Sequence, residues 1–137
     1  MNYIGSQIND SPTIVEKAGA DVTDCRNLLY KYDDNGQLVV AGKGELVAGI
    51  GLIESGYNDV TGGESGKVKA GEDLTVQIKD IGLVKAGGAI KKGAEVASDA
   101  NGKAVEAAEG DYVIGIAQDK AEADGDYIYI QITKYKK

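Results

Sequence analysis

Close pairs of carboxylates are the residues whose spacing could do chemistry in this chain. The pairs are Asp33–Asp34, Glu72–Asp73 and Asp124–Asp126. Such pairs can act as general acid and base or hold a calcium ion. Each pair falls where the sequence predicts a turn, and acidic side chains at turns usually bond the local backbone. Neither the run 33–36 nor the run 119–126 has the spaced oxygen ligands of a known calcium loop. We expect no metal site, with a calcium-dependent adhesion module as an alternative.

The residues of the common nucleophilic sites are missing. The chain has no His and a single Cys, Cys25, so neither a Ser–His–Asp nor a Cys–His arrangement can form. The segments Gly42–Gly44 and Gly49–Gly51 are not followed by the Lys and Ser or Thr of a phosphate-binding loop. We expect Cys25, the lone thiol, to be a small buried apolar residue. The sequence therefore predicts a protein that is not an enzyme and binds no cofactor.

The composition limits the classes of partner. The chain has 137 residues and a net charge of −7. That charge argues against nucleic acid, which binds Lys and Arg, and equally against an anionic membrane surface. The start of the chain lacks the basic and apolar regions of a signal peptide, so we expect synthesis in a cytoplasm. Twenty Gly and one Pro indicate many tight turns rather than long helices.

The chain contains an internal repeat. Residues 33–51 recur 66 residues later as 99–117, and nine of the nineteen positions are identical. Residues 71–78 recur as 125–132, which leaves twelve more residues between the two blocks of the first copy. A repeat of this kind predicts duplicated structure. We expect an arm at 1–12, a first β-repeat at 13–80 with a loop insertion near 54–66, and a second β-repeat at 81–137 that ends in a short basic tail.

Short β-branched and alternating runs, separated by turn signals, predict an all-β protein. We expect a small β-sandwich or barrel built from two tandem related β-subunits. At most one or two short helical turns are expected, around 22–29. The run Asp34–Gly36 predicts a hairpin with a type I′ turn. The expected strands are 13–15, 28–32, 38–40, 45–53, 74–78, 81–84, 95–97, 103–107, 112–117 and 127–133.

Exposed apolar residues at the two ends are the candidates for contact with a partner. In the last strand Ile128 and Ile130 alternate with Tyr127 and Tyr129, so the two rings should face away from the core. Near the start, apolar residues are scattered without a hydrophobic period, which is typical of a mobile end or of an arm that docks on a partner. These N-terminal candidates are Tyr3, Ile4 and Ile8.

Two resemblances compete for the second half of the chain. The segment Gly115–Ala121 resembles the Asp-Lys-Ala hairpin of lipoyl domains, which would make Lys120 the modified residue of a lipoyl- or biotinyl-like carrier. However, the matching region after Gly51 in the first copy has no Lys, whereas in a lipoyl domain that residue sits between symmetric half-repeats.

The second resemblance is to the two-repeat, β-rich decoration or cement proteins of tailed phages. The segments that carry it are Gly88–Val96, Asp99–Lys103, Gly110–Ala117 and Ala123–Ile130, in that order and spacing. The family has no catalytic motif. The resemblance implies a structural protein on the outside of a phage head, a homotrimer whose partner is the major capsid protein lattice. It covers about residues 13–133.

Overall fold

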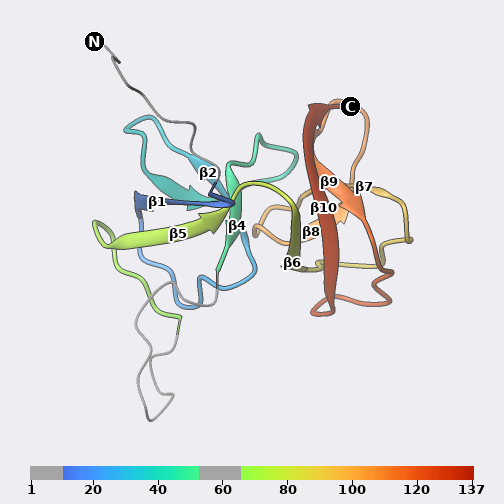
Figure 1. Cartoon of the computed structure of the whole chain (residues 1–137), viewed down its shortest axis with the longest axis horizontal. Helices are drawn as coiled ribbons and strands as arrows, with labels where there is room; N and C mark the ends of the chain where they lie inside the picture. Colours follow the sequence, from blue (N-terminus) through green and yellow to red (C-terminus); the bar gives the residue numbers. More distant parts are fainter. Residues whose placement is uncertain (1–10, 53–65) are drawn as a thin grey trace.

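The computed structural model describes residues 11–52 and 66–137, and its regular structure consists of β-strands (Figure 1). In these two ranges no helix forms, so none is long and apolar enough to cross a membrane. The strands are β1 (Thr13–Lys17), β2 (Leu29–Tyr32), β3 (Leu38–Val40), β4 (Gly49–Gly51), β5 (Asp73–Gln77), β6 (Ile81–Lys85), β7 (Glu95–Ser98), β8 (Ala104–Glu106), β9 (Tyr112–Ala117) and β10 (Tyr127–Lys136).

The strands form two five-stranded antiparallel sheets. The first has the order β1-β5-β4-β2-β3 and the second the order β6-β10-β9-β7-β8. The second sheet therefore repeats the strand order of the first, with β6 to β10 at the positions that β1 to β5 have in the first sheet. Isolated parallel bridges, Ala18 to Leu38 and Ala86 to Ala104, bring the end of β1 toward β3 and the end of β6 toward β8. The predicted all-β fold is confirmed.

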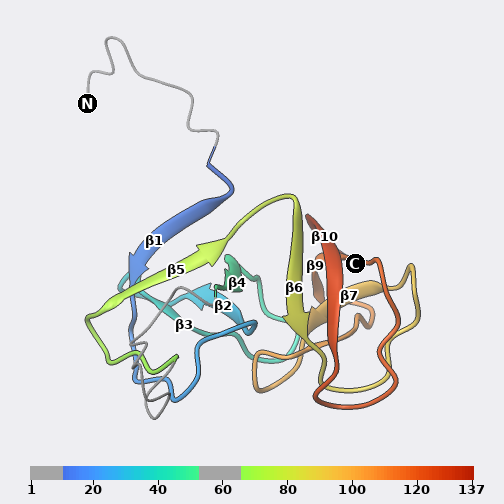
Figure 2. The ribbon, with the colours of Figure 1, turned by 60° about the horizontal axis from the view of Figure 1, so that its bottom comes forward.

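The two sheets lie side by side and share a hydrophobic core (Figures 1 and 2). One cluster joins buried side chains from both halves, among them Leu29, Val47, Ile50, Val84, Val96, Ile114, Ile128 and Ile130. A second cluster lies within the first half and includes Cys25, Tyr30, Leu38, Leu74 and Val76. Burying a Leu or Ile side chain contributes about 1.5–3 kcal/mol. Because the larger cluster spans the boundary, each sheet stabilises the other.

Asn27 ties the first half to the edge of the second sheet. Its side-chain amide donates to the carbonyl of Leu83 at 3.0 Å, and its own carbonyl accepts the N–H of Lys85 at 2.9 Å. The backbone of Asn27 has a φ of 62°, a left-handed conformation that Asn tolerates better than most residues. The outer edge of β6 is thereby closed, as a sheet edge left open invites pairing with another chain.

The hairpin between β2 and β3 forms as predicted, but its turn is not type I′. A type I′ turn needs positive φ at both central residues, whereas in this turn only Gly36 has it, at 74°. The Asp33 carboxylate accepts the N–H groups of Asn35 at 2.8 Å and Gln37 at 2.9 Å. These bonds favour a type I turn followed by a left-handed Gly.

The helical turn allowed around 22–29 does not form. Val22 donates its N–H to the carbonyl of Val68 at 2.7 Å, and Cys25 donates to Gly66 at 2.9 Å. The apolar residues of this segment do pack inward, but its backbone donors bond a distant segment, so they are not free for helical bonds.

The two glycines of β4 allow a close approach of other backbone segments. A Cβ at Gly49 would lie 2.5 Å from the carbonyl oxygen of Gln77, and one at Gly51 would clash with the carbonyl oxygen of Cys25. The regular strand is shorter than predicted. Only Gly49–Gly51 form the regular strand among the described residues of this run, although Ala48 also donates its N–H to the carbonyl of Tyr30 on β2 at 2.7 Å.

The structure describes the C-terminal end of the chain but only small parts of the N-terminal arm and of the insertion. The arm 1–12 and the insertion 54–66 lie almost wholly outside the described residues. The basic residues at the C-terminus do not form a separate tail. They extend β10 to Lys136, after a register shift between Ile132 and Tyr135, and the backbone N–H of Lys137 bonds the carbonyl of Asp111 at 2.9 Å.

Candidate functional site

Exposed apolar side chains lie together on the paired strands β6 and β10. Antiparallel pairing sets Tyr129 opposite Leu83 and places Gln131 between Ile81 of β6 and Ile116 of β9. Directly paired residues point to the same face of a sheet. We call the surface formed by Ile81, Leu83, Ile116, Tyr127 and Tyr129 the β6–β10 face.

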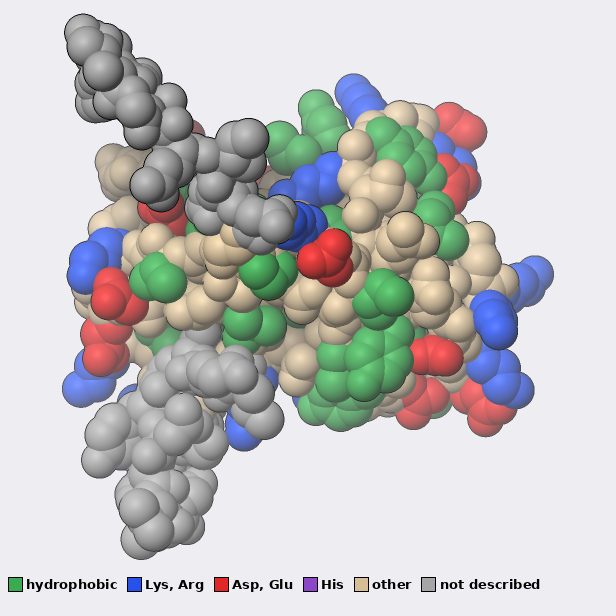
Figure 3. Space-filling view, in the orientation of Figure 1, with side chains coloured by type: hydrophobic (Ala, Val, Ile, Leu, Met, Phe, Trp, Pro, Cys, Tyr) green, Lys and Arg blue, Asp and Glu red, His purple; other side chains and the backbone are tan. Residues whose placement is uncertain are grey.

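The alternation along β10 makes this face. Ile128 and Ile130 are fully buried on the core side, whereas Tyr127 is 55% exposed and Tyr129 is 51% exposed. Ile81 on the neighbouring strand is 54% exposed. In Figure 3 hydrophobic side chains gather over β6 and the adjacent end of β10. Tyr127, Tyr129 and Ile81 thus form an exposed apolar surface on a protein otherwise rich in charge.

Polar groups hold the rim of the face in place. The Asp119 carboxylate accepts the N–H of Tyr129 at 3.1 Å, and the side chains of Gln118 and Gln131 lie within 3.5 Å of each other. These bonds fix the β9–β10 loop against the strand. The rings are therefore presented on a rigid strand rather than on a loose loop.

A groove of 530 Å³ lies where the two halves meet. Its lining residues are Lys31, Tyr32, Asp34, Glu45, Leu46, Val47, Ala48 and Lys134. Lys31 forms an ion pair with Glu45, which lowers the pKa of that carboxyl. The Lys134 ammonium donates to the carbonyl of Ala48 at 2.5 Å, and partial burial lowers its pKa. The groove thus contains a contact between β10 and the first half.

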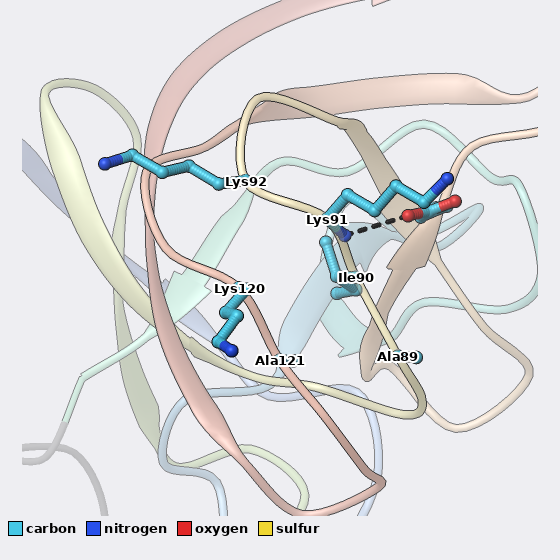
Figure 4. A pocket seen from close by; sticks show the side chains of 7 residues that line it. Ala89, Ile90, Lys91, Lys92, Lys120 and Ala121 are labelled. Carbon is cyan, nitrogen blue, oxygen red and sulfur yellow. Dashed lines mark hydrogen bonds between the residues drawn. The ribbon is translucent and has the colours of Figure 1, made fainter.

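A second pocket, of 450 Å³, lies between the loops before β7 and before β10. Its floor is formed by Ile90 and Ala121, which pair in an isolated antiparallel bridge. Three lysines, Lys91, Lys92 and Lys120, surround this floor (Figure 4). We call this site the lysine pocket. Lys120, the carrier candidate, is highly exposed and forms an ion pair with Glu122 at 3.0 Å.

One carboxylate of each pair singled out at a turn bonds the local backbone, whereas Asp73 and Asp124 form ion pairs with Lys17 and Lys103. Asp99 repeats the arrangement of Asp33, accepting the N–H of Asn101 at 2.7 Å and of Lys103 at 2.9 Å. Asp126 accepts the N–H of Glu122 at 2.8 Å. In the part of the chain that the structure describes, no three His, Cys, Asp or Glu side chains come together in a way that could hold a metal ion.

Cys25 is buried and is not activated. Desolvation raises the pKa of its thiol from 9.0 to about 11, so the nucleophilic thiolate is scarce at neutral pH. The hydroxyl of buried Tyr30 donates to the carbonyl of Cys25 at 2.9 Å, and burial raises the pKa of Tyr30 as well. Both groups belong to the core of the first half.

The sequence located only part of this candidate interface. Tyr127 and Tyr129 lie together and exposed, as predicted, while Tyr3, Ile4 and Ile8 lie outside the described residues. Sequence reasoning missed Ile81 and Leu83, which the register of β6 against β10 brings beside the rings. It also missed the groove and the lysine pocket, because each is made from loops far apart in the chain.

The chain matches one family profile in sequence and a solved structure in fold. A search of curated proteins found no match. The fold is similar to a crystal structure of the N base of head fiber gp8.5 in bacteriophage phi29, with a TM-score of 0.61 and 20% identity. That likeness covers 91% of this chain and 98% of the other. The profile of the phage cement proteins matches residues 32–132, which include strands of both sheets. The chain therefore belongs to the phage cement protein family, and it is a structural protein of a phage virion.

Proposed function

We propose that this protein decorates the outside of a phage head as a homotrimer and stabilises the assembled lattice of the major capsid protein. The observation that carries the proposal is the family match, because it spans residues 32–132 and so includes most of both sheets. The fold that the chain shares with a phage head fiber base supports an attachment to the head. The protein would be made in the host cytoplasm and act at the head surface without binding nucleic acid or membrane.

The β6–β10 face is our candidate for the contact between subunits of the trimer. Interfaces of stable oligomers are more apolar than those of transient complexes, and Tyr is enriched in them. Tyr127, Tyr129 and Ile81 each leave about half of their surface uncovered in the single chain. A neighbouring subunit that covers these side chains would remove that apolar surface from water.

Stabilisation of the head would follow from mass action. A ligand that binds the assembled lattice but not the separated capsid subunits shifts the equilibrium toward the assembled state. A trimer bound over a local three-fold axis makes three linked contacts, so each contact can be weak while the whole is tight. No chemical step is needed for this role.

We also infer that the chain is a tandem duplication, with units 13–80 and 81–137. The identical strand order of the two sheets supports this inference. So do the matching side-chain bonds at Asp33 and Asp99, which lie 66 residues apart in the two copies of the sequence repeat. The larger hydrophobic cluster would then be the interface between two copies of one unit.

The proposal is tested on heads that lack this protein. Such heads are heated with and without the purified protein, and a dye reports the temperature at which the packaged DNA becomes accessible. We expect the protein to raise that temperature. Analytical ultracentrifugation should give a mass three times that of the 14.3 kDa chain.

Two double variants locate the subunit contact. Tyr127→Ser with Tyr129→Ser should yield a monomer that protects heads poorly. Tyr32→Ser with Leu46→Ser, which removes similarly exposed side chains from the groove, should remain trimeric and protective. A trimer that survives the first pair of changes but not the second would contradict the assignment of the β6–β10 face. A protein that leaves the heads unprotected would contradict the proposed function itself.

A further inference from the structure

The lysine pocket is a built feature that the proposed role does not use. It lies at one end of the second sheet, in the loops 86–94 and 118–126, and not on the strand face that carries Tyr127 and Tyr129. Its floor is rigid, since Ile90 and Ala121 exchange backbone hydrogen bonds of 2.9 Å in both directions. Ile90 and Ala121 are almost completely buried, whereas the lysines around them are exposed.

The charge of the pocket is opposite to that of the molecule. The protein has a net charge of −7, yet three of the seven residues that line this pocket are lysines and one is a carboxylate. That carboxylate, Glu106, accepts the backbone N–H of Lys91 at 2.9 Å. Among the described residues, the ammonium groups of Lys91 and Lys92 form no ion pair, while Lys120 is paired with Glu122.

The positions of the lysines indicate the shape of the ligand. In Figure 4 the side chains of Lys91 and Lys92 extend in opposite directions from their loop, and Lys120 lies between them across the floor. The ammonium groups are therefore spread around an apolar centre and do not converge on one point. A single small anion would reach only one of them, whereas an extended chain with several carboxylates would reach all three.

We propose that the lysine pocket binds an extended acidic peptide segment that carries an apolar side chain between its carboxylates. The apolar side chain would pack on exposed Ala89 and on the aliphatic stems of the lysines, above the buried floor, and the flanking carboxylates would pair with the ammonium groups. The apolar floor favours a peptide over a sugar or nucleic acid polymer, whose contacts would be mainly polar. This inference does not depend on the head-decoration role, because it is argued only from the residues that line the pocket.

The proposal is tested with a synthetic peptide, acetyl-Glu-Asp-Leu-Glu-Asp-amide, added to the full-length protein labelled with ¹⁵N. We expect the amide signals of 89–92 and 120–121 to shift on titration. Binding should weaken as salt is raised, because salt screens exposed charges. A peptide with Ser in place of Leu should bind more weakly, and one with Lys in place of the acidic residues should not bind.

Matched variants separate the pocket from general electrostatics. Lys91→Gln with Lys92→Gln should weaken peptide binding about fivefold to tenfold, as expected for losing two exposed ion pairs. Lys43→Gln with Lys69→Gln removes the same charge from exposed positions of the first half and should leave binding within about twofold of the wild type. Equal loss in both variants, or shifts spread over the whole surface, would overturn the proposal. Head binding is measured separately, so failure here leaves the decoration role standing.

Discussion

At the scale of the residue, the same side chain makes the same turn in both halves. Asp33 and Asp99 each accept two backbone N–H groups, and each turn then places a Gly in the left-handed region. The surroundings of the two glycines differ. Gly36 is exposed, whereas Gly102 is buried at the junction and its carbonyl accepts the N–H of Leu29 at 2.7 Å.

This difference predicts unequal effects of one substitution. Gly36→Ala should lower the free energy of unfolding by about 1 kcal/mol, because a Cβ there meets open space and only the positive φ is unfavourable. Gly102→Ala should lower it by about 3 kcal/mol, since its Cβ would also lie 2.5 Å from Val40 and 3.0 Å from the Leu29 carbonyl. Urea denaturation of both variants measures this. Equal losses would show that the two turns have equivalent surroundings in solution.

The buried thiol and phenol predict a loss of stability in alkali. Because the pKa of Cys25 is raised from 9.0 to about 11, the thiol favours the folded state below pH 9, and this contribution is lost as the pH rises toward 11. The raised pKa of Tyr30 acts in the same direction. Thermal unfolding followed from neutral pH to pH 11 should show this decline, and Cys25→Ala should reduce it. An unchanged decline in that variant would assign the loss to other groups.

At the scale of the element, hydrophobic alternation and turn signals located nearly all the strands. The run 127–132 alternates so regularly that its two faces could be read directly, and the structure buries Ile128 and Ile130 as predicted. The predicted type I′ turn between β2 and β3 was wrong. The Asp33 side chain bonds the turn backbone, so the turn type is not set by the Asn-Gly pair alone. Strand pairing across the chain could not be predicted, since the register that sets Leu83 beside Tyr129 depends on the whole sheet.

The alternation in β10 predicts a contrast between neighbouring positions. Ile130→Thr should lower the free energy of unfolding by about 3 kcal/mol, because it removes buried apolar contacts and buries a hydroxyl. Tyr129→Thr should change it by about 0.5 kcal/mol or less, since half of that side chain is already in water and Thr suits a strand. Denaturation at a concentration where the protein is monomeric checks both. Similar losses at the two positions would contradict the assignment of faces.

At the scale of the whole molecule, two small sheets become stable by sharing one core. Neither half has a large aromatic content of its own, as the chain lacks Trp and Phe and depends on eight Tyr. The larger cluster compensates by drawing Leu29, Val47 and Ile50 of the first half under the second sheet. The β6–β10 face is not part of this core and remains available for contacts. Such an arrangement fits a protein whose proposed role is to bind other subunits.

Cosedimentation with phage heads shows directly whether this chain binds the assembled capsid. The labelled protein is mixed either with assembled heads that lack it or with the same mass of unassembled capsid subunits, and each mixture is centrifuged through a sucrose cushion. We predict that the protein pellets with the heads, saturates at a fixed number of trimers per head, and stays in the supernatant with the subunits. A protein that remains in the supernatant in both mixtures would contradict the claim that this chain binds the assembled capsid.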